Sequence, residues 1–346
     1  MTLLRKEAIT NLPRDAMPSD PALPGLVLLD PPIRLIHVAA PLLRDWLGPH
    51  ARLLDGRVTV KRFVAGKRCI FELELTTARE KTSSVERRRL IGKIYAKDHG
   101  EKAYHALQAL KSKAFAGGRF LIPEPLAYDS TWRLLLVSRA KGKSLRALLV
   151  TGSHVSRELK AAAEWLLQLH QCGIRIGRAY TTERQLHTLA MWKKSLTEVF
   201  PEAEPLMGNL LRQIAERKSA LPPWKPAPTH RDFSPDHLIV DGDRITGLDF
   251  DEFCQYDPLF DVAHFQAHLR LLSLINFGAL DRFDSWAQHF ESCYLAGAQD
   301  YSADRVRFYE AIAYFKLAHI AAAVRPFPNW KHTTEALLGA ANRLAE

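Results

Sequence analysis

The chain has 346 residues, of which 47% are hydrophobic and 25% are charged, a balance typical of a globular protein with one large core or two smaller ones. Its net charge of +10 attracts anions, but the basic residues are scattered and their densest runs carry no interleaved aromatic residues, so we expect no specific nucleic-acid partner. The sequence has no signal-peptide core, no run near the ~20 apolar residues of a membrane span and no C-x-x-C pair, so we expect a cytoplasmic protein with reduced thiols and no membrane partner.

The first half of the chain predicts an antiparallel sheet with one helix. A Pro-rich lead over residues 1–25, which we expect to be flexible, is followed by a helical stretch that ends near Trp46. Apolar and charged residues then alternate as in half-exposed strands, with a turn at Gly66 and Lys67. The predicted elements are strands over residues 57–64, 69–75 and 89–95, a helix over 101–111, and extended segments over 121–125 and 133–137.

Beyond Gly142 the apolar spacing becomes helical, apart from one predicted hairpin over residues 238–248 with a turn at Asp241-Gly242-Asp243. The predicted helices cover residues 153–171, 191–199, 206–219, 259–277, 283–296 and 306–324. The fold class is therefore α+β, and the character of the chain changes at residues 138–143.

The most informative stretch of the sequence runs from His230 to Asp261. It holds an ordered series of carboxylates around two short apolar runs: Asp232, Asp236, Asp249, Asp251, Asp257 and Asp261. Phosphoryl transfer needs an aligned nucleophile, neutralised phosphate charge and positioned metal ions. One isolated His-x-Asp is more simply interpreted as a helix cap or a turn, but the ordered series as a whole favours phosphoryl transfer.

Two of these carboxylates are assigned different tasks. Asp232, in the segment before the hairpin, is the candidate to orient an acceptor hydroxyl and take its proton. Asp249, at the end of the second hairpin strand, is placed to reach Mg²⁺, which prefers oxygen ligands. Hairpin pairing brings Asp249 back near residue 237, so we expect the carboxyl groups of Asp232 and Asp249 to converge on one cleft where two lobes meet.

These motifs resemble those of a known superfamily. His230-Arg231-Asp232 with Pro235 resembles the catalytic loop of kinase-like enzymes, and Asp249-Phe250-Asp251 resembles their metal-binding motif. The sequence is more similar to the aminoglycoside phosphotransferase and choline kinase group of small-molecule kinases, which show a similar Asp-Pro-x-x-Asp segment, here residues 257–261. The likeness extends more weakly over residues 55–330.

This resemblance implies a bilobal, protein kinase-like fold. The N-lobe, a small antiparallel sheet with a helix, is expected over residues 26–138, and the mainly helical C-lobe over residues 139–346. His230 and Asp261 would support the catalytic loop, Asp261 by accepting backbone hydrogen bonds. A protein kinase is excluded by spacing, because only six residues separate Asp251 from Pro258 and leave no room for a peptide-binding activation segment.

The resemblance also implies which residues hold the nucleotide. Lys93 resembles the lysine that grips the α- and β-phosphates, and Glu101 is its expected carboxylate partner. The glycine-rich loop that covers the phosphates in the family is represented here only by one glycine with a neighbouring lysine. The adenine edge would bond backbone groups near the boundary between the lobes. The implied nucleotide-binding residues are Lys93, Glu101, Gly66, Lys67, Ser138 and Ala140.

One residue departs from the family pattern. His237 stands where the family usually has a metal-binding Asn, five residues after the catalytic Asp. An imidazole nitrogen is a poor ligand for Mg²⁺ and a better one for Mn²⁺ or Zn²⁺. Three interpretations remain open: His237 binds the metal through nitrogen, Asp251 or Asp236 replaces it, or the site binds nucleotide without turnover.

We therefore predict an ATP-dependent phosphotransferase that moves the γ-phosphate to a hydroxyl of a small molecule, with Mg²⁺, or Mn²⁺ in its place, as the metal. Basic residues in the insert over residues 175–225 favour an anionic or sugar-like acceptor over a cationic aminoglycoside. Two alternatives are a nucleotide-binding pseudokinase with a regulatory role and nucleic-acid binding by the basic surface. The oligomeric state is left open.

Two further patterns are given a structural interpretation. His264 and His268 are four residues apart on a predicted helix, but they lack the intervening carboxylate of an H-E-x-x-H site, so we expect packing. Trp192, Trp224 and Trp286 are interpreted as core residues.

Overall fold

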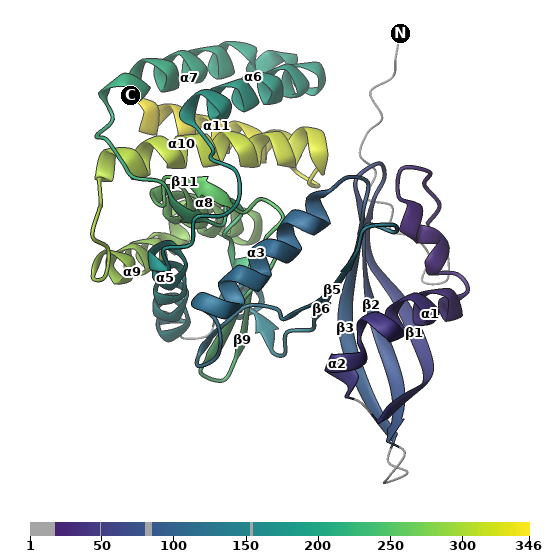
Figure 1. Cartoon of the computed structure of the whole chain (residues 1–346). Helices are drawn as coiled ribbons and strands as arrows, with labels where there is room; N and C mark the ends of the chain where they lie inside the picture. Colours follow the sequence, from purple (N-terminus) through teal and green to yellow (C-terminus); the bar gives the residue numbers. More distant parts are fainter. Residues whose placement is uncertain (1–17, 49, 80–84, 153–154) are drawn as a thin grey trace. The chain divides into compact units, whose positions relative to one another are not determined.

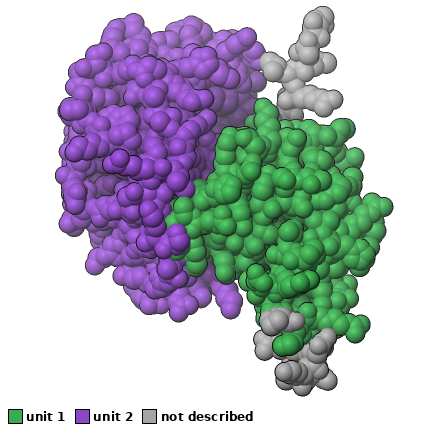
Figure 2. Space-filling model, viewed as in Figure 1, with its two compact units in different colours: residues 1–111, 122–140 green, residues 112–121, 141–346 purple. Residues whose placement is uncertain are grey.

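The computed structural model describes residues 18–48, 50–79, 85–152 and 155–346 (Figure 1). The chain divides into two compact units, which Figure 2 colours separately. Unit 1 comprises residues 1–111 and 122–140, and unit 2 comprises residues 112–121 and 141–346. The chain therefore passes between the units three times, and the last passage, after Ala140, falls where the sequence changes character.

Unit 1 contains a five-stranded sheet in the order β1-β2-β3-β6-β5, in which all neighbours are antiparallel (Figure 1). The predicted strands are present, but the first three are longer than predicted, because charged residues at their ends also join the ladder. The strands are β1 (Ala51–Val64), β2 (Arg68–Arg79), β3 (Val85–Tyr95), β5 (Pro125–Asp129) and β6 (Leu134–Ser138).

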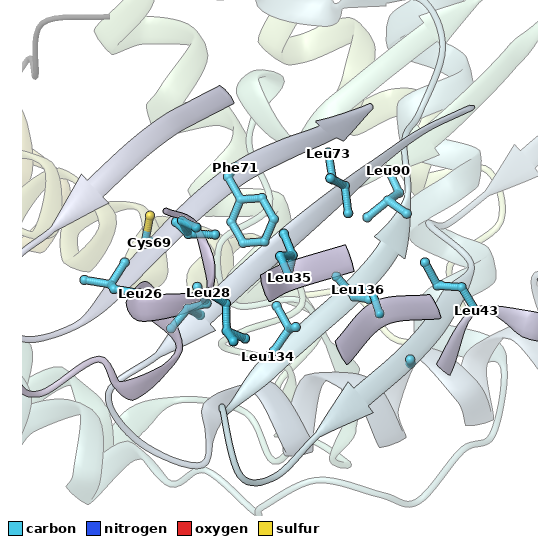
Figure 3. Packing of buried hydrophobic residues seen from close by; sticks show 14 of the residues in the cluster. Leu26, Leu28, Leu35, Leu43, Cys69, Phe71, Leu73, Leu90, Leu134 and Leu136 are labelled. Carbon is cyan, nitrogen blue, oxygen red and sulfur yellow. The ribbon is translucent and has the colours of Figure 1, made fainter. Parts of the chain in front are cut away.

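One face of this sheet forms the core of unit 1 (Figure 3). Successive side chains of a strand point to opposite faces, and the buried residues of β2 accordingly recur at every second position. These residues are Cys69, Phe71, Leu73 and Leu75, all fully buried. Gly92 on β3 lies opposite Phe71 in the register, and a Cβ at Gly92 would lie 2.1 Å from the Phe71 ring. The glycine is therefore needed for the aromatic ring to cross β3.

Short helices cover this core. Leu28, Leu35 and Leu43 from the N-terminal segment pack against strand residues such as Leu134 and Leu136 (Figure 3). Residues 1–17 of the expected flexible lead lie outside the described residues, whereas Leu23, near its end, is buried in the core. The helices of unit 1 are the 3₁₀ helix η1 (Pro24–Leu28), α1 (Pro32–Leu42), α2 (Arg44–Leu47) and α3 (His99–Lys113), whose last two residues fall in unit 2.

Unit 2 is mainly helical. In Figure 1, α6 and α7 lie beside each other and contact α10 and α11, respectively. The sequence analysis did not predict α4 or α11. The helices are α4 (Leu145–Val150), α5 (Ser156–Gln171), α6 (Thr182–Val199), α7 (Glu204–Arg217), α8 (Leu259–Phe277), α9 (Asp284–Leu295), α10 (Ala303–His319) and α11 (Trp330–Ala345).

The predicted hairpin forms the centre of a four-stranded sheet in unit 2, in the order β4-β10-β9-β7. The hairpin strands β9 (Leu238–Asp241) and β10 (Arg244–Gly247) pair so that Leu238 lies opposite Gly247. The neighbours are β4 (Phe120–Leu121), which is parallel to β10, and β7 (Lys143–Ser144). The extended segment predicted over residues 121–125 is thus divided, because Leu121 ends β4 in unit 2 and Pro125 begins β5 in unit 1.

Two expectations from composition can be compared with the described residues. No helix among them is both long enough and apolar enough to cross a membrane. All four cysteines are free thiols, and burial raises the pKa of Cys69 and of Cys254 to about 12. At neutral pH these two thiols are therefore protonated core residues.

Candidate active site

A loop that carries most of the predicted site begins after β8 (Ala227–Thr229), which pairs with β11 (Cys254–Tyr256). Asp261, in the first turn of α8, is fully buried and fixes the start of this loop. Its Oδ2 accepts the backbone N–H of His230 at 2.7 Å, and its Oδ1 accepts that of Arg231 at 2.8 Å. The Nε2 of His170 lies 3.2 Å from the same Oδ2. Asp261 thus holds two consecutive backbone donors of the loop.

His230 ties the loop to the segment after the hairpin. Its Nε2 lies 2.8 Å from the carbonyl oxygen of Leu248, so Nε2 carries a proton and donates it. Its Nδ1 accepts the backbone N–H of Asp232 at 3.3 Å. Burial lowers the pKa of His230, which favours the neutral ring that these two bonds require. One side chain therefore positions both predicted catalytic segments.

Backbone strain marks the same two segments. Arg231 has φ 69° and Asp249 has φ 64°, values that are uncommon for residues other than glycine and that concentrate at functional sites. The Arg231 conformation is held by its side chain, whose guanidinium lies 3.8 Å from the ring centre of Tyr180 and 4.3 Å from that of Phe260. Its Nη1 also donates to Gln185 at 2.9 Å. The guanidinium group of Arg231 thus interacts with buried groups of the protein.

Asp232 is partly exposed, with 35% of its side chain accessible. Its Oδ1 accepts a hydrogen bond from Lys316 of α10 at 2.8 Å. Burial alone would raise the pKa of Asp232, but Lys316, with smaller effects of neighbouring groups, holds that pKa well below its usual value. Asp232 is therefore a carboxylate at neutral pH and can accept a proton.

Sequence reasoning missed Lys316 and gave His264 only a packing role. The Nδ1 of His264 lies 3.0 Å from the carbonyl oxygen of Phe233, so this nitrogen donates and Nε2 is left as an acceptor. Lys316 Nζ lies 3.0 Å from that Nε2. Burial and then the Lys316 charge lower the pKa of His264 well below its usual value, so the ring is neutral. The only signal in the sequence was a lone lysine between Phe315 and Leu317, within the otherwise apolar run of residues 311–318.

His237 lies between the two predicted catalytic carboxylates. Its Nε2 is 3.7 Å from Oδ2 of Asp249, and its Nδ1 is 3.7 Å from Oδ2 of Asp232. Nδ1 is also 2.7 Å from the carbonyl oxygen of Asp232, which can only accept, so Nδ1 carries the proton. In the neutral ring, the lone pair of Nε2 then faces Asp249. The structure therefore brings Asp232 and Asp249 to opposite sides of one imidazole in unit 2.

The two other predicted carboxylates differ in position. Asp251 is partly buried in the turn two residues after Asp249. Asp236 is turned to the surface, where it is 46% exposed and pairs with Arg146 at 3.2 Å. Among the residues that the structure describes, no group of three or more His, Cys, Asp or Glu side chains could hold a metal ion. Magnesium sites of phosphoryl-transfer enzymes usually take only one or two protein ligands, with phosphate and water supplying the rest.

An aromatic cluster packs against the segments that carry Asp232 and Asp249. Trp165 of α5 stacks on Phe233 with ring centres 5.6 Å apart, and it also contacts Phe250 at 6.3 Å. Its Nε1 donates to the carbonyl oxygen of Leu121 at 2.9 Å. A Cβ at Gly247 would lie 2.1 Å from the Trp165 ring, so β10 needs a glycine there to pass over the indole. The residues next to Asp232 and Asp249 thus rest on one ring.

The predicted nucleotide-binding residues lie mainly in unit 1. Lys93 is buried on β3, between β2 and β6, and Glu101 is exposed on the first turn of α3. The pairing of these two residues stays a prediction. Gly66 and Lys67 form the β1–β2 turn, and the Gly66 N–H is bonded to Asp20 at 2.5 Å. The Gly66 N–H is therefore already bonded within unit 1.

The segment predicted to meet adenine is at the end of β6. The backbone N–H of Ser138 donates to the carbonyl oxygen of Glu124 at 2.9 Å, and its hydroxyl oxygen accepts the Glu124 N–H at 2.8 Å. The Ser138 N–H is therefore already used within unit 1. Ala140 is the last residue of that unit.

Comparisons with known proteins agree with this fold. The family model described as "APH: Phosphotransferase enzyme family" matches residues 78–307. A thermostable mutant of aminoglycoside phosphotransferase APH(4)-Ia, in ternary complex with AMP-PNP and hygromycin B, has a TM-score of 0.56 at 16% identity, covering 85% of this chain and 93% of that one. A choline/ethanolamine kinase family protein from Mesorhizobium loti has a TM-score of 0.53 at 17% identity, covering 92% and 95%. LicA in complex with AMP has a TM-score of 0.57 at 10% identity, covering 89% and 98%.

At these identities the structural similarities establish the fold. No curated protein matches the sequence.

Proposed function

The chain belongs to the phosphotransferase enzyme family, and we propose that it transfers the γ-phosphate of ATP to a hydroxyl group of a small molecule. The family and the structural neighbours support a small-molecule phosphotransferase. The observation that carries the proposal for this chain is the cluster Asp232–His237–Asp249. The two ring nitrogens of His237 each lie 3.7 Å from a carboxylate oxygen, Nδ1 from that of Asp232 and Nε2 from that of Asp249.

Asp232 is proposed to receive the acceptor. Its carboxylate is partly exposed and ionised. A group that orients a hydroxyl and takes its proton needs both properties. The backbone on which it stands is held by Asp261 and His230, so the carboxylate is fixed before any ligand binds. Such preorganisation is what phosphoryl transfer requires, because positioning and charge supply most of the catalysis.

A divalent cation fits the donor set beside Asp232. Nε2 of His237, which has a free lone pair in the neutral ring, and Oδ2 of Asp249 face each other, and Asp251 lies two residues further on. His237 and Asp249 would hold the ion, with phosphate and water as its remaining ligands, and the bound ion would neutralise phosphate charge. Because one ligand is an imidazole nitrogen, the set favours Mn²⁺ over Mg²⁺ more than an all-oxygen set would.

The nucleotide is proposed to be ATP. Neighbouring structures contain AMP-PNP, ADP or AMP, which supports a nucleotide ligand. In unit 1, Lys93 is proposed to bind phosphate oxygens, with Glu101 as its partner, and Gly66 with Lys67 to cover them. Backbone groups of residues 138–140 are proposed to bind the adenine edge. The Ser138 N–H is not among them, because it already donates to the Glu124 carbonyl oxygen. The acceptor is proposed to be sugar-like or anionic.

The proposal is tested by turnover. The purified protein is incubated with γ-labelled ATP, Mg²⁺ or Mn²⁺, and a panel of sugars, sugar acids, polyols and amino alcohols. We expect a labelled product from at least one hydroxyl compound. ATP-dependent thermal stabilisation without labelled product in either metal would contradict a working enzyme.

That contrary result would instead support a nucleotide-binding pseudokinase with a regulatory role. The position of His237 is the observation that favours it, because a protonated ring 3.7 Å from Asp249 would pair with that carboxylate and exclude a cation. The two functions are therefore separated by whether phosphate leaves the nucleotide.

Metal preference gives a more specific prediction. Replacing His237 with asparagine exchanges the nitrogen ligand for a carboxamide oxygen, so we expect the affinity for Mn²⁺ relative to Mg²⁺ to fall by about 10-fold. Mn²⁺ binding is followed by electron paramagnetic resonance, and the kcat with each metal is compared in parallel. His332→Asn, at an exposed position of α11, is the matched control and is expected to leave both affinities unchanged. Equal metal selectivity in wild type and His237→Asn would exclude His237 as a ligand.

A further inference from the structure

Lys316 is the residue of the site that no sequence motif marks. Its ammonium group has three N–H bonds, and three acceptors surround it. These are Oδ1 of Asp232 at 2.8 Å, Nε2 of His264 at 3.0 Å and, more distantly, the carbonyl oxygen of Arg231 at 3.5 Å. The side chain is only 17% exposed, although lysine side chains are almost always at the surface. A fixed positive charge therefore stands against the carboxylate that is proposed to receive the acceptor.

The position of this charge is built into the fold. His264 is fully buried, and its bond to the Phe233 carbonyl oxygen leaves Nε2 as the acceptor for Lys316. His268, one turn further along α8, packs against His264 with ring centres 4.6 Å apart. Burial lowers the pKa of His268 to about 4, so both rings are neutral and neither repels the ammonium group. Two helices thus hold Lys316 at Asp232.

A second cation would not be stabilised beside this pair. The charge of Asp232 is already balanced by Lys316, so an acceptor that carries an amine near its reacting hydroxyl gains no net electrostatic attraction from the pair. Without the Lys316 charge, Asp232 alone would attract that amine. At ~5 Å and an effective dielectric constant of ~20, such an attraction favours binding on the order of 100-fold.

α6 packs against α10, the helix that carries Lys316 (Figure 1). His319 lies one turn after Lys316 on α10, and Trp192 of α6 stacks on it with ring centres 5.6 Å apart. Glu183 of α6 and Glu204 of α7 are paired with Lys218 and Lys193, respectively. Each of these two negative charges is therefore balanced by a lysine.

We propose that Lys316 determines the class of acceptor by cancelling the attraction of Asp232 for cations, so that the Asp232 site takes neutral or anionic hydroxyl compounds in preference to compounds with an amine beside the reacting hydroxyl. The inference rests on the proposed phosphotransferase function and adds to it a residue and a selection rule.

The wild-type protein can be tested before its acceptor is identified. A metabolite extract is divided at neutral pH on a strong cation-exchange resin, and each fraction is incubated with the protein and γ-labelled ATP. We expect labelled product from the unretained fraction, which holds neutral and anionic compounds. Product formed only from the retained, cationic fraction would overturn the inference while leaving the phosphotransferase function intact. No product from the undivided extract would refute the proposed function, and the inference with it.

Variants then separate the charge of Lys316 from its structural contribution. Lys316→Gln removes the charge but keeps an amide donor, and Lys316→Arg keeps the charge. Transfer is compared for D-gluconate, D-sorbitol and D-glucamine, which share one polyol chain and differ in the charge at one end, and for the acceptor found in the extract with its aminated analogue. We expect Gln to raise the cationic-to-anionic ratio of kcat/KM by about 100-fold and Arg to retain the wild-type ratio.

A ratio is used because general damage to the fold lowers all rates together and leaves the ratio unchanged. An unchanged ratio in Lys316→Gln would overturn the inference. If that variant does not fold, as judged by circular dichroism and thermal unfolding, Lys316→Met is used in its place, because an apolar chain of similar length preserves packing against His264. An unchanged ratio in Lys316→Met is equally contrary.

Discussion

Asparagine in place of Asp232 is expected to lower kcat by about 10²- to 10⁴-fold, the range observed when a positioned general base is removed. The amide has the same shape and can still accept a hydrogen bond from Lys316, but it cannot take the proton of an acceptor hydroxyl. Against the opposing effect of burial, Lys316 keeps the pKa of Asp232 well below its usual value, so the wild-type side chain is ionised at neutral pH. The substitution therefore compares a carboxylate that can accept a proton with an amide that cannot. The measurement is single-turnover transfer from γ-labelled ATP.

The matched control is Asp243→Asn. Asp243 is exposed at the tip of the β9–β10 hairpin, so the same chemical change there is expected to alter kcat by less than about 3-fold, as is usual for surface substitutions. ATP-analogue affinity is measured in both variants by calorimetry. A kcat of Asp232→Asn within tenfold of wild type would mean that another group receives the proton.

The second large effect is expected on stability. Alanine in place of Asp261 leaves the backbone N–H groups of His230 and Arg231 without their acceptor inside the protein. An unsatisfied buried donor costs about 1–3 kcal/mol, so the free energy of unfolding is expected to fall by about 2–6 kcal/mol. Because the loop that carries Asp232 is then no longer fixed, kcat is expected to fall as well. Urea denaturation monitored by tryptophan fluorescence measures the first effect.

Asp304→Ala controls for the loss of an acidic residue from the first turn of a helix. Asp304 occupies the first turn of α10 as Asp261 does that of α8, but its side chain is 64% exposed. Its loss is expected to change the free energy of unfolding by less than about 0.5 kcal/mol. Similar destabilisation by the two substitutions would show that Asp261 acts through the helix end and not through the loop.

The parts of the site that were predicted from sequence are those set by local spacing. The hairpin over residues 238–248 was recognised from its turn and apolar runs, and pairing across a hairpin is short in range. That pairing correctly placed Asp249 near residue 237. The α+β fold class is likewise confirmed, because a period of two in the first half and helical spacing in the second directly indicate the elements.

The rest of the site depends on packing between distant segments. Lys316 is 84 residues from Asp232 in the chain, and they meet because α10 packs against α8, whose Asp261 holds the loop that carries Asp232. His264 belongs to a helix that is buried on nearly all sides, so no polar face distinguishes a functional position from a core position. The three interpretations of His237 could not be ranked either. The proton on Nδ1 is assigned from the carbonyl oxygen of Asp232, and only the folded loop brings that oxygen to the ring.

The three passages of the chain between units 1 and 2 limit how this protein can be divided. Residues 112–121 are inserted between two stretches of unit 1, yet β4 completes the sheet of unit 2 and the Leu121 carbonyl oxygen accepts the Trp165 indole N–H. A fragment that starts at Lys141 would expose the β10 edge and would remove the acceptor of the Trp165 indole, which packs against the loop that carries Asp232. The helical unit is therefore not a severable module, and an independently expressed version must have residues 112–121 grafted back beside β10.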